Sequence, residues 1–175
     1  MGGRVAVVGA SSQVGGRVVA ELLRRGDAVT AFSRSDRFDP AAPGMWRRLP
    51  APDAASESLN PGNETIESWI FVAHVWVLPD YFALMKAYGA RRLVAVSSTS
   101  QFTKVESSVS AERDVAARLA TGEEKVAAWC RDNGVTWTVL RPTLIYGGGR
   151  DRNIEAVSRF ARRFRFFPLL GAASG

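Results

Sequence analysis

The stretch Val7-Val8-Gly9-Ala10-Ser11-Ser12-Gln13-Val14-Gly15-Gly16 joins a short apolar run, residues 4–8, to an amphipathic helix near the N-terminus. Gly9 permits a tight turn at the end of the predicted strand, and the helix that follows directs its free N–H groups and positive dipole end at the turn. Gly15 suits close packing of the helix on the strand. The stretch therefore predicts a site for a pyrophosphate group, with an unliganded strand-to-helix turn as the alternative.

Ser12 occupies the middle position of this turn, where a glycine would let the backbone approach a pyrophosphate most closely. Its Cβ must either crowd the phosphate or be compensated by the hydroxyl, which can donate a hydrogen bond. A second interpretation makes Ser11 or Ser12 the cap of the helix, a role that needs no ligand. The residues expected to contact a dinucleotide here are Gly9, Ser11, Ser12, Gln13, Val14 and Gly15.

Strand and helix patterns alternate along the rest of the chain. Apolar runs predict strands at residues 28–32, 69–73, 92–97 and 135–140, with a further short strand at 46–49. Three-to-four spacing predicts helices from Val14 to a stop at Gly26 and at residues 79–88, 111–132 and 154–164. Gly122 is expected to weaken the middle of the helix at 111–132. This order predicts an α/β fold, a Rossmann-type doubly wound parallel sheet with helices on both faces.

The composition fits one globular domain. The chain has 175 residues, of which 46% are hydrophobic and 23% are charged, close to ordinary usage in such domains. The single cysteine, Cys130, allows no internal disulfide and is expected in the core, so a cytoplasmic location is predicted. The longest nearly apolar stretch, Trp69–Leu78, is about half the length needed to span a bilayer. No transmembrane helix is expected.

Most of the net positive charge lies in the C-terminal part of the sequence. The formal net charge is +6, and the residues from Arg141 onward hold seven arginines against two acidic residues. A basic patch is therefore expected there rather than over the whole domain, and nucleic-acid binding is not expected. The basic and aromatic stretch Arg159–Leu170 favours, as an alternative contact, an anionic membrane surface or a protein partner.

Three further segments follow the glycine turn in an order and spacing that match a known family. They are Ile70-Phe71-Val72-Ala73-His74, Leu93-Val94-Ala95-Val96-Ser97-Ser98-Thr99 and Leu140-Arg141-Pro142-Thr143-Leu144-Ile145-Tyr146-Gly147. Together with the glycine turn they resemble the NAD-dependent epimerase/dehydratase group of extended and atypical short-chain dehydrogenases/reductases, whose turn is Gly-x-x-Gly-x-x-Gly. The resemblance covers nearly the whole chain, although residues 36–67 contribute little.

This resemblance implies an NAD(P)-binding Rossmann domain over residues 1–150 and the start of an incomplete substrate-binding region at 151–175. It also implies a role in substrate contact for Thr99 and places five more residues beside the dinucleotide: Ala73, His74, Ser97, Pro142 and Thr143. Two of these residues have simpler interpretations, His74 as a neutral hydrogen-bonded group and Thr99 as the cap of a turn. The sequence leaves open which small molecule is the substrate and whether the chain forms a homo-oligomer.

The end of the second predicted strand, Ala31-Phe32-Ser33-Arg34, bears on the choice between NAD(H) and NADP(H). An acidic residue at this point accepts a hydrogen bond from the ribose 2′-hydroxyl of NAD(H), whereas a nearby arginine accommodates the 2′-phosphate of NADP(H). Arg34 can hold a phosphate by two parallel hydrogen bonds, and Ser33 can add a third. NADP(H) is therefore favoured. The alternatives are that Arg34 is simply solvated and that Asp36 selects NAD(H).

The acid/base pair of the resembling family has no match in this sequence. That family places tyrosine and lysine as Tyr-x-x-x-Lys, whereas the residue four positions beyond each tyrosine of this chain is methionine or arginine. When Glu123 is aligned with the acid that commonly follows the lysine, Val115 and Leu119 take the tyrosine and lysine positions. Both are apolar and fit the buried stripe of a helix. Tyr146 or Lys104 remains as a substitute acid if the fold brings it beside the site.

Two classes of function are consistent with these observations. The first is an NAD(P)-binding enzyme that acts on a nucleotide sugar or a small carbonyl compound. The second is a non-catalytic dinucleotide-binding sensor or accessory subunit of a larger complex, which the missing tyrosine and lysine favour. The pair Glu123-Glu124 is interpreted as part of a solvated helix face, and the sequence contains no metal-binding pattern.

Overall fold

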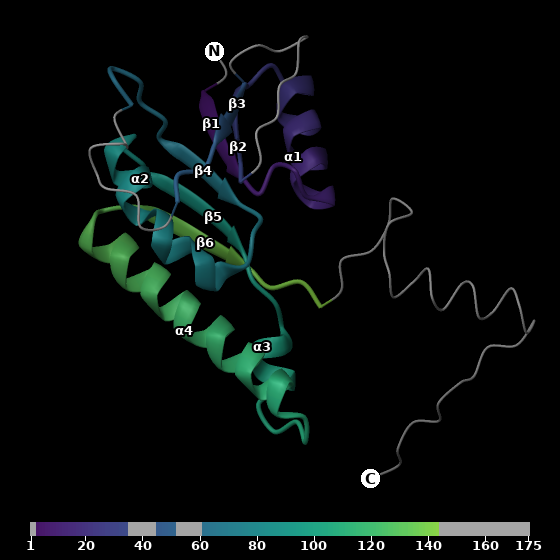
Figure 1. Cartoon of the computed structure of the whole chain (residues 1–175). Helices are drawn as coiled ribbons and strands as arrows, with labels where there is room; N and C mark the ends of the chain where they lie inside the picture. The colour runs from purple at the N-terminus through teal and green to yellow at the C-terminus, as the bar shows by residue number, and fades with distance from the viewer. Residues whose placement is uncertain (1–2, 35–44, 52–60, 144–175) are drawn as a thin grey trace, which may run out of the picture. The chain divides into compact units, whose positions relative to one another are not determined.

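Six parallel strands form one sheet within the part of the chain that the computed structural model describes, residues 3–34, 45–51 and 61–143. The strands are β1 (Arg4–Val8), β2 (Ala28–Ser33), β3 (Trp46–Arg48), β4 (Ser68–Phe71), β5 (Arg92–Val96) and β6 (Thr136–Leu140). Their order in space is β3-β2-β1-β4-β5-β6 (Figure 1). The chain therefore winds outward from β1 in one direction and from β4 in the other, and the predicted doubly wound sheet is confirmed.

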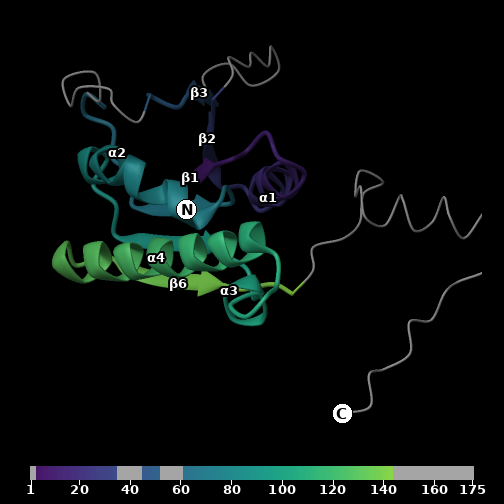
Figure 2. The same cartoon turned by 60° about the horizontal axis from the view of Figure 1, so that its bottom comes forward.

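Helices cover both faces of this sheet, as predicted. They are α1 (Gln13–Arg24), the 3₁₀ helix η2 (Val75–Tyr81), α2 (Phe82–Ala87), α3 (Ser100–Thr103) and α4 (Ser110–Asp132). The helix α1 lies on one face, and α2 and α4 lie on the other (Figure 2). Val19 of α1 shares a small buried cluster with Val7 and Ala31. The larger core on the opposite face includes Phe32 and Trp69, whose rings stack at 5.5 Å.

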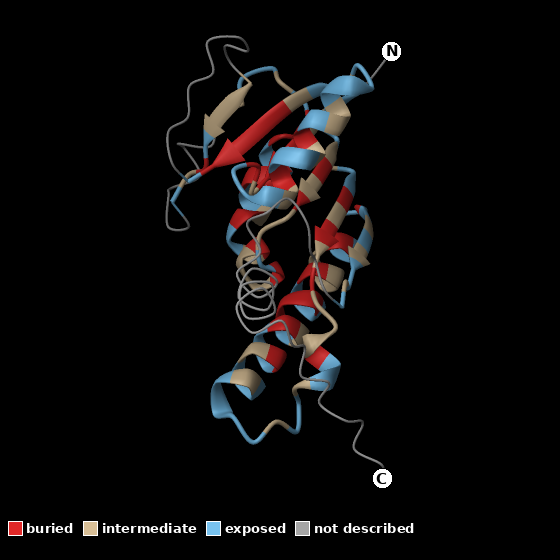
Figure 3. Cartoon of the chain, turned by 90° about the vertical axis from the view of Figure 1, so that its right-hand side faces the viewer, coloured by how far each residue is buried: buried red, intermediate tan, exposed pale blue. Residues whose placement is uncertain are grey.

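Successive side chains of each strand point to opposite faces of the sheet, so the same strands contribute to both hydrophobic cores. Val7 faces α1, whereas Ala6 and Val8 belong to the core beneath α4, because successive side chains of a strand point to opposite faces. The buried residues are concentrated in the strands and on the inner sides of the helices (Figure 3). Parallel strands covered on both faces need such nearly continuous apolar runs, and it was these runs that predicted the strands.

The long helix α4 packs closely on η2 at Gly122. A Cβ built on Gly122 would lie 2.8 Å from the Trp76 Cα and 2.9 Å from the Trp76 N. The expectation that Gly122 weakens the helix is therefore incomplete, because the missing side chain lets two backbones approach each other. Leu119, Val126 and Cys130 form the buried stripe of α4, and Cys130 is completely buried as predicted.

The region expected as one helix at residues 79–88 is built differently. It begins at Val75 as the 3₁₀ helix η2, which contains Pro79, and continues as α2 only from Phe82. Val75, Leu78 and Tyr81 are all buried, and their three-residue spacing matches the period of a 3₁₀ helix rather than that of an α-helix. The short helix α3 was not predicted at all.

Several features of the sequence lie outside the described residues. They include Asp36, Tyr146, the glycine run Gly147–Gly149, the predicted helix at 154–164 and the whole segment 151–175. Among the described residues, no helix is long and apolar enough to cross a membrane. The same residues contain no group of three or more His, Cys, Asp or Glu that could hold a metal ion.

Candidate functional site

The sequence motifs meet at the edge of the sheet where the strands end. All the strands are parallel, so their carboxyl ends lie at one edge. The neighbours β1 and β4 lead to crossovers in opposite directions, which makes the space beyond their ends the topological switch point of the sheet. Ligands of open α/β sheets bind at such points. The glycine turn after β1 and the segment Val72–His74 after β4 border this switch point.

Gly9 and Gly15 are both restricted to glycine, Gly9 by its positive φ and tight surroundings and Gly15 by a direct clash. Gly9 has φ +82°, and a Cβ built on it would lie 3.1 Å from the Ala73 N and 3.1 Å from Val72 Cγ2. A Cβ on Gly15 would clash with the Gly9 carbonyl oxygen and would lie 2.7 Å from the Ala10 Cα. Gly9 therefore sets the left-handed turn, and Gly15 lets α1 pack directly on it. Both roles match those predicted from the sequence.

Ser12 caps the helix α1. Its Oγ accepts a hydrogen bond from the Gly15 N at 3.0 Å, and its own N donates to the Gly9 carbonyl oxygen at 3.0 Å. Both serines are exposed, and the capping interpretation is confirmed for Ser12, the N-cap residue of α1. A serine hydroxyl that accepts one hydrogen bond still has a proton to donate. Gln13 is exposed and Val14 is half-buried in the first turn of the same helix.

The end of β2 places an exposed arginine beside the switch point. Arg34 forms no ion pair with any acid in the described ranges. Ser33 is buried, with 2% of its surface exposed, and its carbonyl oxygen accepts a hydrogen bond from the Leu49 N at 2.7 Å. Arg34 is thus available to an anion in solution, whereas Ser33 lies inside the protein.

The end of β4 carries an aromatic stack that sequence reasoning missed. The His74 ring is nearly parallel to the ring of Trp76, with 4.2 Å between centroids. The Arg118 guanidinium of α4 lies over Trp76, with its Cζ 4.4 Å from the ring centroid. Partial burial lowers the pKa of His74, and the positive charges of Arg118 and Arg34 lower it further. The lowered pKa favours the neutral ring, whereas the hydrogen bond in its simpler interpretation is replaced by stacking on Trp76, and the side chain does not cap η2.

Glu123 is buried, which contradicts its interpretation as part of a solvated face. It is 8% exposed, and Arg141 at the end of β6 donates from Nε to Glu123 Oε2 at 2.9 Å. Gln101 donates from Nε2 to Glu123 Oε1 at 2.9 Å. Burial alone would raise the pKa of Glu123, but these hydrogen bonds outweigh it and hold the pKa below its ordinary value. The signal was present in the sequence, because Glu123 follows Leu119 by four residues on the buried stripe.

The segments after β5 and β6 are tied together at the same edge. The Ser97 N donates to the Leu140 carbonyl oxygen at 2.8 Å, and the Thr99 N donates to the Pro142 carbonyl oxygen at 3.3 Å. The Ser97 hydroxyl is buried and makes no hydrogen bond of ordinary geometry with a described residue, although it contributes to lowering the pKa of Glu123. Thr143 follows Pro142 and is exposed. The structure thus places Ser97, Pro142 and Thr143 at the predicted edge.

Thr99 directly precedes α3, at its N-cap position. Its side chain makes no capping hydrogen bond, and the Ser98 Oγ accepts instead from the Ser100 N at 3.1 Å. Thr99 is half-buried. The alternative interpretation of Thr99 as a side-chain cap is therefore wrong.

Side chains suited to acid/base chemistry are absent from the two positions where the resembling family has them. Leu119 is buried in the core and Val115 packs against the same core. Tyr81 and Tyr88 are also core residues, with 4% and 6% of their surfaces exposed. Lys104, the suggested substitute, is paired with Glu112 at 2.7 Å. Among the described residues, no tyrosine and lysine stand together at the edge of the sheet.

No protein-family model and no curated protein sequence matches this chain. Solved structures do match it. The UDP-N-acetylglucosamine 4-epimerase from Bacillus cereus has a TM-score of 0.69 and 16% identity, over 91% of this chain and 62% of that one. A wide-type short-chain dehydrogenase/reductase from Veillonella parvula in complex with NADP has a TM-score of 0.59 and 18% identity, over 86% and 73%.

MoeE5, whose structure contains UDP-glucose and NAD, has a TM-score of 0.58 and 24% identity, over 91% of this chain and 60% of that one. The chain thus spans about three-fifths of both this protein and the Bacillus cereus epimerase. Similarities at these identities concern the fold. The chain therefore has the Rossmann-type fold shared by nucleotide-sugar epimerases and short-chain dehydrogenases/reductases.

Proposed function

We propose that this chain binds NADP(H) at the switch point between β1 and β4. The proposal rests on the glycine turn, in which Gly9 adopts a positive φ in tight surroundings and Gly15, with no space for a Cβ, brings the first turn of α1 against the end of β1. A helix N-terminus with close backbone approach is suited to a pyrophosphate, because its N–H groups and dipole favour negative charge. Similar folds crystallised with NAD or NADP support the proposal.

The residues present fit this cofactor. The backbone from Ser11 to Val14 would hold the pyrophosphate, and the hydroxyl proton of Ser12 compensates for the glycine that it replaces. The exposed segment around Pro142 and Thr143 would border the nicotinamide. When bound, the nicotinamide supplies hydride transfer, and the protein supplies binding and orientation.

NADP(H) is preferred over NAD(H) in this proposal because of Arg34. The guanidinium is exposed and has no ion-pair partner in the described part of the chain, so an incoming phosphate does not have to displace a carboxylate of that part. A planar guanidinium can bind a phosphate through two parallel hydrogen bonds. Ser33 is buried, with 2% of its surface exposed, so the proposal does not rely on a hydrogen bond from its hydroxyl to the phosphate.

A nucleotide sugar or a small carbonyl compound is the substrate class that the resemblance implies. Thr99 is the residue of this edge that would meet a substrate oxygen, since its side chain is half-buried and does not cap α3. A hydroxyl in such a place can orient a substrate but is a weak acid on its own.

A second candidate function is dinucleotide binding without turnover, as a sensor or an accessory subunit. It is favoured by the burial of Val115 and Leu119, which leaves the site without the acid/base pair. Under this function the bound dinucleotide stabilises a conformation of the protein and is not consumed. Measured hydride transfer separates the two candidates, and both require the same binding site.

Thermal unfolding with NADPH and with NADH tests the binding proposal. A ligand that binds only the folded chain must raise the unfolding temperature, and we expect a larger rise with NADPH. Gly9→Val should abolish the rise, because a branched Cβ at φ +82° is strained and meets Ala73. Gly3→Val is the matched control, since nothing lies within 4 Å of a Cβ there. A folded Gly9→Val protein with unchanged NADPH affinity would remove the site from this turn.

A further inference from the structure

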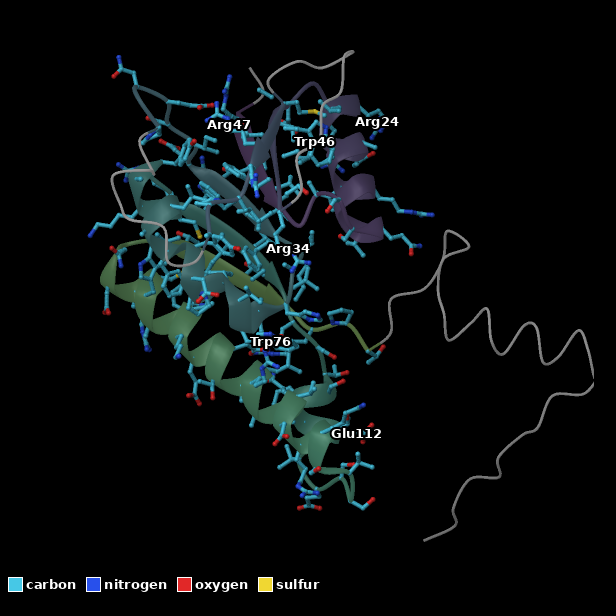
Figure 4. All side chains as sticks on the ribbon, in the orientation of Figure 1. Arg24, Arg34, Trp46, Arg47, Trp76 and Glu112 are labelled. Carbon is cyan, nitrogen blue, oxygen red and sulfur yellow. The ribbon has the colours of Figure 1, made fainter. Side chains whose placement is uncertain are left out.

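The aromatic stack at the end of β4 stands beside the proposed dinucleotide site and has no assigned role. We define the cationic shelf as Arg34, His74, Trp76 and Arg118. Its members come from the end of β2, the segment after β4, the helix η2 and the helix α4. Trp76 lies where η2 meets α4 (Figure 4). Four elements of the fold thus contribute side chains near the carboxyl edge of the sheet.

The shelf carries positive charge that no described carboxylate neutralises. Neither Arg34 nor Arg118 forms an ion pair within residues 3–34, 45–51 and 61–143. Other arginines of the chain are paired, as Arg24 is with Glu21 and Arg92 with Glu67. Both Arg34 and Arg118 act electrostatically on His74, whose pKa they lower. An anion bound beside the His74 ring would therefore be attracted by both positive charges.

The shelf is also held in place before any ligand arrives. The guanidinium of Arg118 lies 4.4 Å from the Trp76 ring centroid, and the His74 ring stacks on the same indole at 4.2 Å. The backbone of Trp76 is fixed in turn by its close contact with Gly122. A guanidinium that rests on an aromatic face keeps its N–H edge free for an oxyanion and loses less freedom when it binds one.

We propose that the cationic shelf binds a phosphate group, with Arg118 as the principal ligand and His74 as a neutral N–H donor. A phosphate carries close to two negative charges near pH 7, so the positive charges of Arg118 and Arg34 attract it more strongly than they attract a carboxylate. Arg118 and His74, which would contact this group, take no part in the NADP(H) contacts proposed above, so this inference does not require the dinucleotide to bind. It implies that the small molecule handled at this edge of the sheet is phosphorylated.

His74 gives a direct readout, because it is the only histidine of the chain. Its ring pKa can be followed by NMR as a single titrating signal. Addition of inorganic phosphate, compared with chloride at equal ionic strength, should raise this pKa, since an anion between the arginines stabilises the protonated ring. Arg118→Gln should raise the pKa without phosphate and weaken the phosphate response about tenfold, as expected for the loss of a charge-assisted hydrogen bond.

Arg131→Gln is the matched control, because Arg131 is an exposed arginine near the other end of α4. It should respond to phosphate like the unmodified chain. A stronger response to glycerol 1-phosphate than to inorganic phosphate would assign the group to an organic ligand, and the reverse would assign it to free phosphate. Equal effects of phosphate and chloride, or an unchanged response in Arg118→Gln, would overturn the proposal. Gly9→Val should keep the phosphate response even where NADPH binding is lost.

Discussion

Replacement of Glu123 by alanine tests the polar cluster that joins α4 to the end of β6. The change leaves the Gln101 amide, itself 8% exposed, without its acceptor, and an unsatisfied buried donor costs roughly 1–3 kcal/mol. The side chain of Arg141 is 42% exposed, so water replaces part of what it loses, and the larger cost of a fully buried ion pair does not apply. We expect the free energy of unfolding to fall by about 2 kcal/mol at neutral pH.

Urea unfolding of the Glu123→Ala variant and of the unmodified chain, at neutral and at acidic pH, measures this cost. The pKa of Glu123 is lowered in the folded state, so its contribution is present above the unfolded-state pKa and disappears as the pH falls through the folded-state pKa. The two proteins should therefore differ less in acid. Glu124→Ala, at an exposed neighbouring position, is the control. A loss under about 0.5 kcal/mol at neutral pH, or one that does not shrink in acid, would refute this reasoning.

Three further changes have defined outcomes. Gly122→Ala should destabilise the chain by about 1–3 kcal/mol in thermal unfolding, because its Cβ meets the Trp76 backbone at 2.8 Å; a gain in stability would contradict that contact. Arg34→Ala should weaken NADPH more than NADH by about 1.5–3 kcal/mol, and equal losses measured by calorimetry would exclude the 2′-phosphate role. Hydride transfer from NADPH to ketones, aldehydes and nucleotide sugars should be undetectable, and turnover that Lys104→Met or Tyr146→Phe eliminates would identify a replacement acid.

The parts of the fold that depend on local pattern could be predicted from the sequence. The strands are buried on both faces and read as apolar runs, and the glycine turn needs residues without side chains, so Gly9 and Gly15 stand out by type and spacing. For Ser12 the sequence suggested two roles, a hydrogen bond to phosphate and a cap of the helix, and the structure shows the cap. Strand burial, the glycine turn and the helix cap each depend on residues that are close together in the sequence.

The side-chain contacts of the candidate site that the sequence did not predict join segments that are distant in the sequence. The spacing from Leu119 places Glu123 on the buried stripe of α4, but its partners, Gln101 and Arg141, lie 22 and 18 residues away, and nothing in local spacing identifies them. Trp76 and Arg118 likewise meet only because α4 packs on η2. Pairings of this kind are set by tertiary packing, and a single sequence does not contain the distances that would reveal them.

The reactivity of Cys130 can be used to measure how often α4 separates from the sheet. The thiol is completely buried in α4, and burial raises its pKa to about 11, so the reactive thiolate is scarce while the helix stays packed. Because no other thiol competes, modification by a maleimide in solution can proceed only through molecules in which α4 has separated from the sheet. The labelling rate therefore measures the free energy of that opening under native conditions, and a bound nucleotide that holds the sheet closed would slow it without any engineered probe.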